Sequence, residues 1–474
     1  MKLRSGISGC LALLLAVALV GSGCSWGGTG EGSRLAEAPS SSAVEAAAQP
    51  TAAPSPTPAP TPTPQPSPVT VEGTITAAAA DWFNLLLPDG TLFTVLFSQA
   101  GQGQVENCVN GNLARVTYDE TARQGDTVTA WEVQISVPEQ YAGVEERLSS
   151  MTLEEKVGQL FFVRVPAEGA DADVAQYHFG GYILFGRDFK GQTREQVQQT
   201  LQSYQASSKI PLLLGVDEEG GTVVRVSANP NLCEEPYYSP RALYDMGGLD
   251  VVAAVEQDKI ATLQGLGLNV NFAPVCDISQ QEGAFMYGRS LGRDAETISE
   301  YIRKMVGLYS QNSMGCVLKH FPGYGNNADT HTGMAIDERP YETFRQQDFQ
   351  PFQAGIQAGA GCVLVSHNIV TCVDGQYPAS LSSQWHQVLR EELGFTGCVI
   401  TDDLVMDAIR QYCDASSAAV QAVKAGNDLL CCSDYETQYP AVLAAVQNGE
   451  ISEERIDESV RRALRWKAQL GILG

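Results

Sequence analysis

Eight short apolar segments of strand-like composition constrain the fold of this chain more than any other feature of its sequence. They are FFVRV (161–165), GGYILFG (180–186), PLLLGVD (211–217), LNVNFAPV (268–275), GCVLKHFP (315–322), GCVLVSH (361–367), GCVITDD (397–403) and AGNDLLCC (425–432). Apolar strands that alternate with helices predict a parallel sheet covered on both faces. Over roughly 330 residues, eight such units most simply close into an α/β barrel of the (β/α)8 TIM type, which we place at 140–474. A doubly wound open sheet is the alternative, although the glycine-rich dinucleotide loop that such sheets often carry is missing.

The stretches between these segments have helical periodicity. REQVQQTLQSYQAS (194–207) and AETISEYIRKMVGLYSQN (295–312) place apolar residues on one face of a helix. Thr152-Leu-Glu-Glu155 is a capping-box pattern, which predicts the start of a helix at the entrance to the barrel. Cys316, Cys362 and Cys398 stand inside the apolar segments, so we expect them to be buried.

Two regions of different composition precede the barrel. Residues 25–69 are rich in proline and threonine and end in TAAPSPTPAPTPTPQPSP, which predicts a disordered, semi-rigid linker. Residues 70–138 hold short strand-like runs separated by turn residues, which predicts a small all-β domain of OB-like or SH3-like size. A spacer is the favoured role for this domain, and carbohydrate or cell-wall binding is the alternative.

The first residues are typical of an export signal. Lys2 and Arg4 precede an apolar stretch, Cys10–Val20, that is short for a membrane span of about 20 residues. Small residues then lead into Cys24. The pattern resembles a bacterial lipoprotein signal, which implies a signal peptide over 1–23, lipidation of Cys24 and anchorage on the extracellular face of the cell membrane. Cleavage and secretion is the alternative.

The charge balance limits the partners of the chain. Asp and Glu number 55 against 30 Lys and Arg, a formal net charge of -25. Binding to nucleic acid requires clustered basic side chains, so we expect no nucleic-acid partner. For the same reason we expect contact with a membrane only through the lipid anchor. The oligomeric state does not follow from the sequence.

Polar residues gather where the predicted strands end. Asp217, Lys319-His320, His367 and Asp402-Asp403 follow or close four different segments. In a closed barrel the carboxyl ends of the strands form one face, where several strands direct side chains at a single substrate. The sequence therefore predicts an active site on this face.

The types of these residues favour acid–base and nucleophilic chemistry without a metal or cofactor. His320 and His331 lie eleven residues apart on a loop with glycine, proline and asparagine, which is not the helical spacing of a hydrolytic zinc site. Ser366-His367 lies at a strand end but lacks the flanking glycines of the elbow that carries a serine nucleophile. Asp402 at a strand end suits a carboxylate nucleophile. In Asp329-Thr330-His331 the aspartate is placed to orient a histidine that donates and accepts protons.

Four strings in this order resemble glycoside hydrolase family 3, and more closely its NagZ-type β-N-acetylglucosaminidase (β-N-acetylhexosaminidase) branch. They are GVDEEGGTVVRV (215–226), GRSLGRD (288–294), KHFPGYGNNADTH (319–331) and ITDDLVMDAI (400–409), and the resemblance covers about 145–474. It implies a retaining glycosidase with Asp402 as nucleophile and His331, paired with Asp329, as acid/base. It further implies that Asp217, Arg225, Arg289, Lys319 and His320 hold the sugar.

The chain departs from the family pattern at several positions. Tyr324 stands where the family commonly has a histidine, Glu218 where it has glutamine, and Thr222 where it has arginine. These differences bear on substrate preference and leave the catalytic positions intact. Besides hydrolysis of terminal β-linked N-acetylhexosamine, two functions stay open at this point: a phosphorylase that transfers the sugar to phosphate, and a non-catalytic protein that binds cell-wall glycan. The natural aglycone is not predicted.

Overall fold

The computed structural model describes residues 65–97, 107–327, 329–330 and 333–473. The predicted signal peptide, Cys24 and nearly all of the predicted linker lie outside the described residues. Within the described part of the chain, no helix combines the length and apolar character needed to cross a membrane.

The eight predicted strands are present, and all of their pairings are parallel. They form one sheet in the order β14-β12-β10-β9-β8-β7-β6-β15. Their bounds are β6 (Phe161–Arg164), β7 (Gly181–Leu184), β8 (Leu213–Val216), β9 (Val270–Asn271), β10 (Gly315–Phe321), β12 (Cys362–Val365), β14 (Cys398–Thr401) and β15 (Leu430–Cys432). A further parallel bridge, from Ile400 to Leu429, connects the two ends of the sheet, so the strands close into a barrel.

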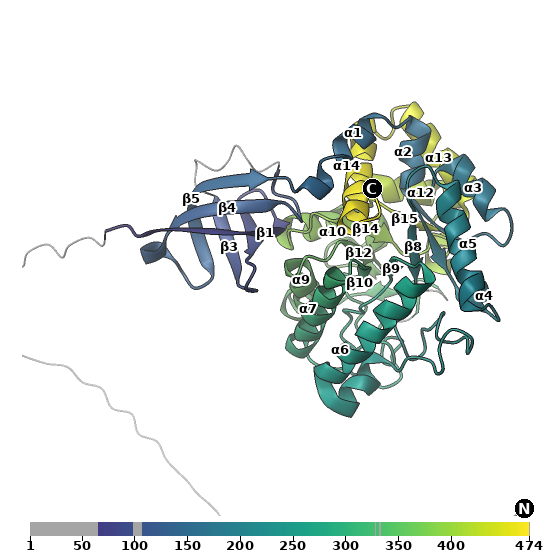
Figure 1. Cartoon of the computed structure of the whole chain (residues 1–474), viewed down its shortest axis with the longest axis horizontal. Helices are drawn as coiled ribbons and strands as arrows, with labels where there is room; N and C mark the ends of the chain where they lie inside the picture. The colour runs from purple at the N-terminus through teal and green to yellow at the C-terminus, as the bar shows by residue number, and fades with distance from the viewer. Residues whose placement is uncertain (1–64, 98–106, 328, 331–332, 474) are drawn as a thin grey trace, which may run out of the picture. The chain divides into compact units, whose positions relative to one another are not determined.

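Helices surround this sheet, as Figure 1 shows. The longer ones are α2 (Leu153–Gln159), α3 (Ala170–Tyr177), α5 (Arg194–Ser207), α6 (Pro240–Leu266), α7 (Ala295–Gln311), α9 (Phe349–Gln357), α12 (Ala415–Ala425), α13 (Tyr435–Gln447) and α14 (Glu453–Gln469). The predicted capping box opens α2: Thr152 accepts from the Glu155 N–H, and the Glu155 carboxylate accepts from the Thr152 N–H. The two helices predicted from periodicity are α5 and α7.

The inside of the barrel is filled by side chains rather than hollow. Phe162 on β6 and Phe272 just after β9 meet edge to face at 5.2 Å between ring centroids. Gly215 on β8 makes this pair possible, because a Cβ there would lie 2.7 Å from one ring and 2.9 Å from the other. Cys316, Cys362 and Cys398 are buried as expected. The barrel is thus a packed scaffold that holds its strand ends at fixed positions.

Five strands before the large barrel form a small closed barrel in the order β1-β2-β3-β5-β4. They are β1 (Pro68–Ala78), β2 (Trp82–Leu86), β3 (Leu92–Phe97), β4 (Leu113–Asp119) and β5 (Thr127–Ser136). Five strands closed in this way have the size and closure of an OB fold. β1 begins within the predicted linker, because Val69 already pairs with Tyr118, and a proline is tolerated as the first residue of a strand.

Asp428 joins the seam of the large barrel to its last helix. Its carboxylate accepts from the Val399 N–H on β14 (2.9 Å), and its own N–H donates to the Val399 carbonyl (2.8 Å). The same carboxylate pairs with Arg390 (2.6 Å) and with Arg462 on α14 (2.9 Å). Burial would raise the pKa of Asp428, but these guanidinium groups and the main-chain donor outweigh it and hold the pKa well below its usual value.

Replacement of Asp428 by asparagine should destabilise the whole barrel. Asp428→Asn removes a fully buried carboxylate and leaves the partly buried guanidinium groups of Arg390 and Arg462 without their counter-charge. We expect the free energy of unfolding at pH 7 to fall by about 3 kcal/mol. Because folding lowers the pKa, this stabilisation is present above the unfolded value of about 3.9 and is lost as the pH falls below it. Urea unfolding at pH 7 and in acid measures both effects.

Asp250→Asn is the matched control. Asp250 also pairs with a cation, Lys304 at 2.7 Å, but its side chain is 96% exposed, and exposed ion pairs contribute little to stability. Equal losses of stability in the two variants would contradict the role that we assign to Asp428.

Candidate active site

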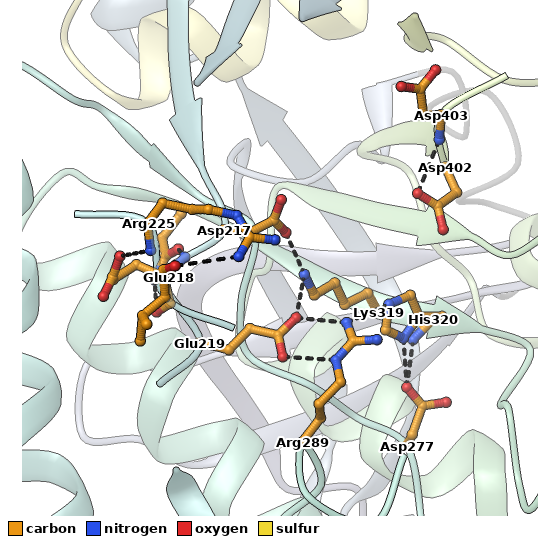
Figure 2. Close-up of polar contacts among 12 residues, drawn as sticks. Asp217, Glu218, Glu219, Arg225, Asp277, Arg289, Lys319, His320, Asp402 and Asp403 are labelled. Carbon is orange, nitrogen blue, oxygen red and sulfur yellow. Dashed lines mark hydrogen bonds and ion pairs between the residues drawn. The ribbon is translucent and has the colours of Figure 1, made fainter. Parts of the chain in front are cut away.

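The carboxyl-terminal edge of the large barrel brings together side chains from distant parts of the sequence (Figure 2). Asp217 directly follows β8, Lys319 and His320 close β10, and Asp402 directly follows β14. Parallel strands in a barrel all end at this edge. The predicted gathering of these four residues on one face is therefore confirmed.

A buried lysine is the centre of this cluster. The Lys319 ammonium lies 2.7 Å from a carboxylate oxygen of Asp217 and 2.7 Å from one of Glu219, and its side chain is only 3% exposed. Burial alone would lower the pKa of Lys319, but the two carboxylates outweigh it and raise the pKa above its ordinary value. Lys319 is therefore a fixed positive charge beside Asp217, the one of its two partners that solvent partly reaches.

Arg289 extends the cluster from the other side of Glu219. Its guanidinium donates to both carboxylate oxygens of Glu219, at 3.0 and 2.7 Å, in bidentate geometry. Burial would raise the pKa of Glu219, but Arg289 and Lys319 together hold it well below its usual range. Glu219 is thus ionised while almost wholly buried, which is possible only because two cations contact it.

His320 is oriented by partners at both ring nitrogens. Its Nδ1 lies 2.7 Å from a carboxylate oxygen of Asp277, and its Nε2 lies 3.1 Å from Nη2 of Arg289. Because a guanidinium can only donate, Nε2 accepts, and the ring proton belongs on Nδ1 facing Asp277. These two contacts fix the orientation of the His320 ring.

Glu218, next to Glu219, has a structural task. Its carboxylate accepts from the N–H groups of Arg225 (2.8 Å) and Val226 (2.7 Å) and from the Ser227 hydroxyl. The chain returns to it through Gly220 and Gly221, whose φ angles of +99° and +66° favour glycine. The three consecutive carboxylates therefore differ in their contacts: Asp217 pairs with Lys319, Glu218 holds the loop of residues 225–227, and Glu219 pairs with Arg289 and Lys319.

The two aspartates after β14 point in different directions. Figure 2 shows the Asp402 carboxylate turned toward the side of Lys319 and His320, whereas that of Asp403 points away. The Asp402 N–H donates to the Val365 carbonyl (3.2 Å), and Asp402 Oδ1 accepts from the Asp403 N–H (2.9 Å). Asp403 accepts from Ser433 at 2.5 Å, and burial raises its pKa. Of the two carboxylates, that of Asp402 is therefore the one that faces the cluster.

The loop after β10 carries the predicted dyad. Asp329 lies in this loop and is half-buried, and Thr330 beside it is fully buried. His331 lies outside the described residues, so its role stays a prediction. The Thr330 carbonyl accepts from the Ala408 N–H at 3.4 Å, which brings this loop against the segment that follows Asp402.

Arg225 stands apart from the ion-pair network among the described residues. Its guanidinium donates to the carbonyl of Val224 (3.2 Å) and lies 5.8 Å from the ring centroid of Phe185. Its predicted contact with sugar stays a prediction. His367 is buried, with Nδ1 2.7 Å from the Ser380 hydroxyl and Nε2 3.1 Å from the Asp403 carbonyl, so it supports the Asp402 segment from behind.

Sequence reasoning missed three members of the site: Glu219, Asp277 and Arg164. Arg164 is the last residue of β6, and its guanidinium lies 4.5 Å from the Phe185 ring centroid and acts electrostatically on Asp403. Its place at the end of an apolar strand was a usable signal. Asp277 gave none, because it lies in a long loop six residues beyond the two-residue strand β9.

Comparison with known proteins gives one consistent family. Residues 152–466 match the glycosyl hydrolase family 3 N terminal domain. A Beta-hexosaminidase of Nitrosomonas eutropha (strain DSM 101675 / C91 / Nm57) is 34% identical over 261 residues, which cover 54% of this chain and 74% of that protein. A Beta-hexosaminidase of Stenotrophomonas maltophilia (strain R551-3) is 32% identical over 305 residues, which cover 62% of this chain and 84% of that protein.

Solved structures agree with these matches. A glycoside hydrolase family 3 beta-N-acetylglucosaminidase from Paenibacillus sp. str. FPU-7 is 33% identical with a TM-score of 0.63, over 68% of this chain and 63% of that one. A glycosyl hydrolase of the GH3 family from Mycobacterium smegmatis str. MC2 155 is 31% identical with a TM-score of 0.61, over 69% of this chain and 98% of that one.

The buried network predicts that the charge of Glu219, not its shape, holds the site together. Glu219→Gln is nearly isosteric but leaves Arg289 and Lys319 without a shared counter-ion. We expect the free energy of unfolding to fall by about 3 kcal/mol. Turnover of a glycoside substrate should fall at least tenfold, because Lys319 and Arg289 lose their fixed positions. Thermal unfolding and steady-state kinetics measure the two effects.

Glu218→Gln provides the neighbouring control. Glu218 is equally buried, but its partners are neutral N–H and O–H donors, so an uncharged acceptor can still satisfy part of them. The loss of stability should be clearly smaller than in Glu219→Gln. The reverse order would show that the ion-pair network is not the main constraint.

Proposed function

The chain belongs to glycosyl hydrolase family 3 and is a glycoside hydrolase, and from this we propose that it is a retaining exo-β-N-acetylglucosaminidase. One observation carries the proposal: the Asp402 carboxylate shares the barrel edge with the fixed polar cluster of Asp217, Lys319, Arg289 and His320. That combination offers a nucleophile beside groups that bind hydroxyls. The names of the relatives, hexosaminidase and beta-N-acetylglucosaminidase, support the choice of sugar.

The reaction proceeds by two displacements. In the first, an Asp402 oxygen attacks the anomeric carbon while His331 donates a proton to the departing glycosidic oxygen, which leaves a glycosyl ester on Asp402. In the second, His331 takes a proton from water as the water attacks the same carbon, and the Asp402 carboxylate leaves. Asp329 orients His331 and stabilises its cationic form. Both partners return to their starting states, and no metal or cofactor enters the scheme.

The polar cluster supplies binding groups whose desolvation is already compensated. Lys319 and Arg289 are held by Glu219, and His320 is held by Asp277, so none of them has to reorganise when a sugar arrives. The partly exposed Asp217 carboxylate can accept from a sugar hydroxyl while it keeps its bond to Lys319. The ion pairs thus hold the hydrogen-bonding groups of the cluster in fixed positions.

We place the enzyme on the extracellular face of the bacterial cell membrane, anchored through a lipid on Cys24. The pattern of residues 1–24 and the proline-rich stretch behind it support this proposal. There the substrate would be an N-acetylglucosamine-containing glycan such as a cell-wall fragment.

The decisive measurement is hydrolysis of an aryl β-N-acetylglucosaminide. Asp402→Ala removes the nucleophile and should lower kcat by about a thousandfold or more. Asp403→Asn, the adjacent control, keeps the nucleophile and should lose far less activity. If the wild type does not hydrolyse this substrate, the proposed enzyme activity is wrong. If it cleaves the corresponding aryl β-glucoside faster, the proposed sugar is wrong. Assays with added phosphate that yield mainly the sugar 1-phosphate would make the protein a phosphorylase.

The dyad makes a separate prediction about pH. Asp329→Asn removes the charge that stabilises the protonated histidine, so the histidine should lose its proton at lower pH. The alkaline limb of kcat/KM for a poor leaving group should therefore move to lower pH, while the acid limb, set by the nucleophile, stays in place. Profiles of wild type and variant over the same buffers test this, and an unmoved alkaline limb would exclude Asp329 as the partner.

A further inference from the structure

Tyr324 occupies an unusual position between the sugar-binding cluster and the dyad loop. Its ring is 1% exposed and packs with Val275, Met286 and Phe285, and it meets His320 edge-on at 5.4 Å between centroids. Its N–H donates to Asp277 at 2.7 Å, and the other oxygen of the same carboxylate holds His320. The backbone and ring of Tyr324 are thus fixed to the cluster that holds the sugar.

The Tyr324 hydroxyl reaches the opposite way, to Thr330. It shares a hydrogen bond with the Thr330 hydroxyl and accepts from the Thr330 N–H at 3.3 Å. Thr330 is fully buried, and its carbonyl accepts from Ala408 beyond Asp402. Thr330 is also the residue between Asp329 and His331 in the sequence, so its main chain connects the two members of the proposed dyad.

These contacts form one continuous connection. Asp277 fixes His320 and Tyr324, Tyr324 fixes Thr330, and Thr330 is fixed again from the Asp402 side. Burial raises the pKa of Tyr324 far above its ordinary value, so the hydroxyl keeps its proton at any pH the enzyme meets. The link between the Tyr324 and Thr330 hydroxyls is therefore made by two uncharged groups.

We propose that Tyr324 is a positioning residue for the acid/base dyad, acting through its hydrogen bonds to Thr330. This inference rests on the proposed function. In this scheme the phenol does not contact the substrate. It positions Thr330, the residue that connects Asp329 and His331. Without the Tyr324 hydroxyl, Thr330 loses its hydrogen bonds to residue 324. Small displacements of a proton donor lower the reaction rate strongly.

Two leaving groups test this role. A phenyl β-N-acetylglucosaminide needs a proton on its leaving oxygen, whereas a 2,4-dinitrophenyl one leaves without it, and kcat/KM reports the first displacement for both. Tyr324→Phe should lower kcat/KM for the phenyl substrate about tenfold or more, and change it less than about threefold for the dinitrophenyl substrate. Thr330→Val should give the same pattern, and the double variant should lose no more than either single one.

Tyr182→Phe is the control for loss of a buried tyrosine hydroxyl. Tyr182 is also fully buried, and its hydroxyl donates at 2.8 Å to the carbonyl of Ala170, the first residue of α3. It should be less stable than wild type, with an unchanged ratio between the two substrates. Thr330→Ser keeps a hydroxyl at the same place and should restore the wild-type ratio.

The outcomes distinguish a failure of the positioning role from a failure of the proposed function. An equal fall for both substrates in Tyr324→Phe, or an unchanged ratio, would overturn the positioning role and leave the proposed function standing. A wild-type protein that cleaves neither substrate would overturn the proposed function and this role with it. A selective loss on the phenyl substrate, shared by Thr330→Val, supports the inference.

Discussion

The ion pairs of the buried Lys319 are the constraint on which the rest of the site depends. An ammonium with a side chain 3% exposed is stable only with close counter-charges, and Asp217 and Glu219 supply them at 2.7 Å each. Glu219 in turn is stable only because Arg289 shares it. Each charge of the cluster thus requires the next one, and the barrel must hold β8, β10 and the loop after β9 in register for the set to exist.

This dependence explains how a rigid barrel serves a reaction that needs several roles. The strands fix the positions of Asp217, Lys319 and Asp402, and the loops carry the other residues of the site. The loop after β9 contributes Asp277, which orients His320, and Arg289, which pairs with Glu219, and the loop after β10 contributes Asp329. Activity and stability therefore share residues on this face, whereas Asp428 stabilises the barrel at its seam without contacting the site.

The sequence predicted the strands well, because eight continuous apolar runs have few alternatives once helices separate them. Within the segment predicted over 268–275, β9 is a continuous strand only at Val270–Asn271, and Val275 adds a separate parallel bridge to Lys319. The proline at 274 lacks the N–H that a continuous ladder needs. Lys319, His320 and Asp402 were predictable from their places at strand ends. Glu219 and Asp277 were not, because their partners are far away in the sequence: Arg289 is 70 residues from Glu219, and His320 is 43 from Asp277.

Tyr324 shows how such a site can keep its geometry while one of its residues changes. The resemblance to family 3 puts a histidine at this position, and an imidazole there could gain a positive charge near Asp402, the proposed nucleophile. Tyr324 lies close enough to Asp402 for the aspartate's charge to raise its pKa further, yet burial already keeps the phenol neutral. The electrostatic environment of Asp402 is then independent of protonation at position 324. In the proposed mechanism, a loop held by neutral hydrogen bonds leaves the changes of charge to the dyad, which gives and takes the proton, and to Asp402, which must be deprotonated to attack.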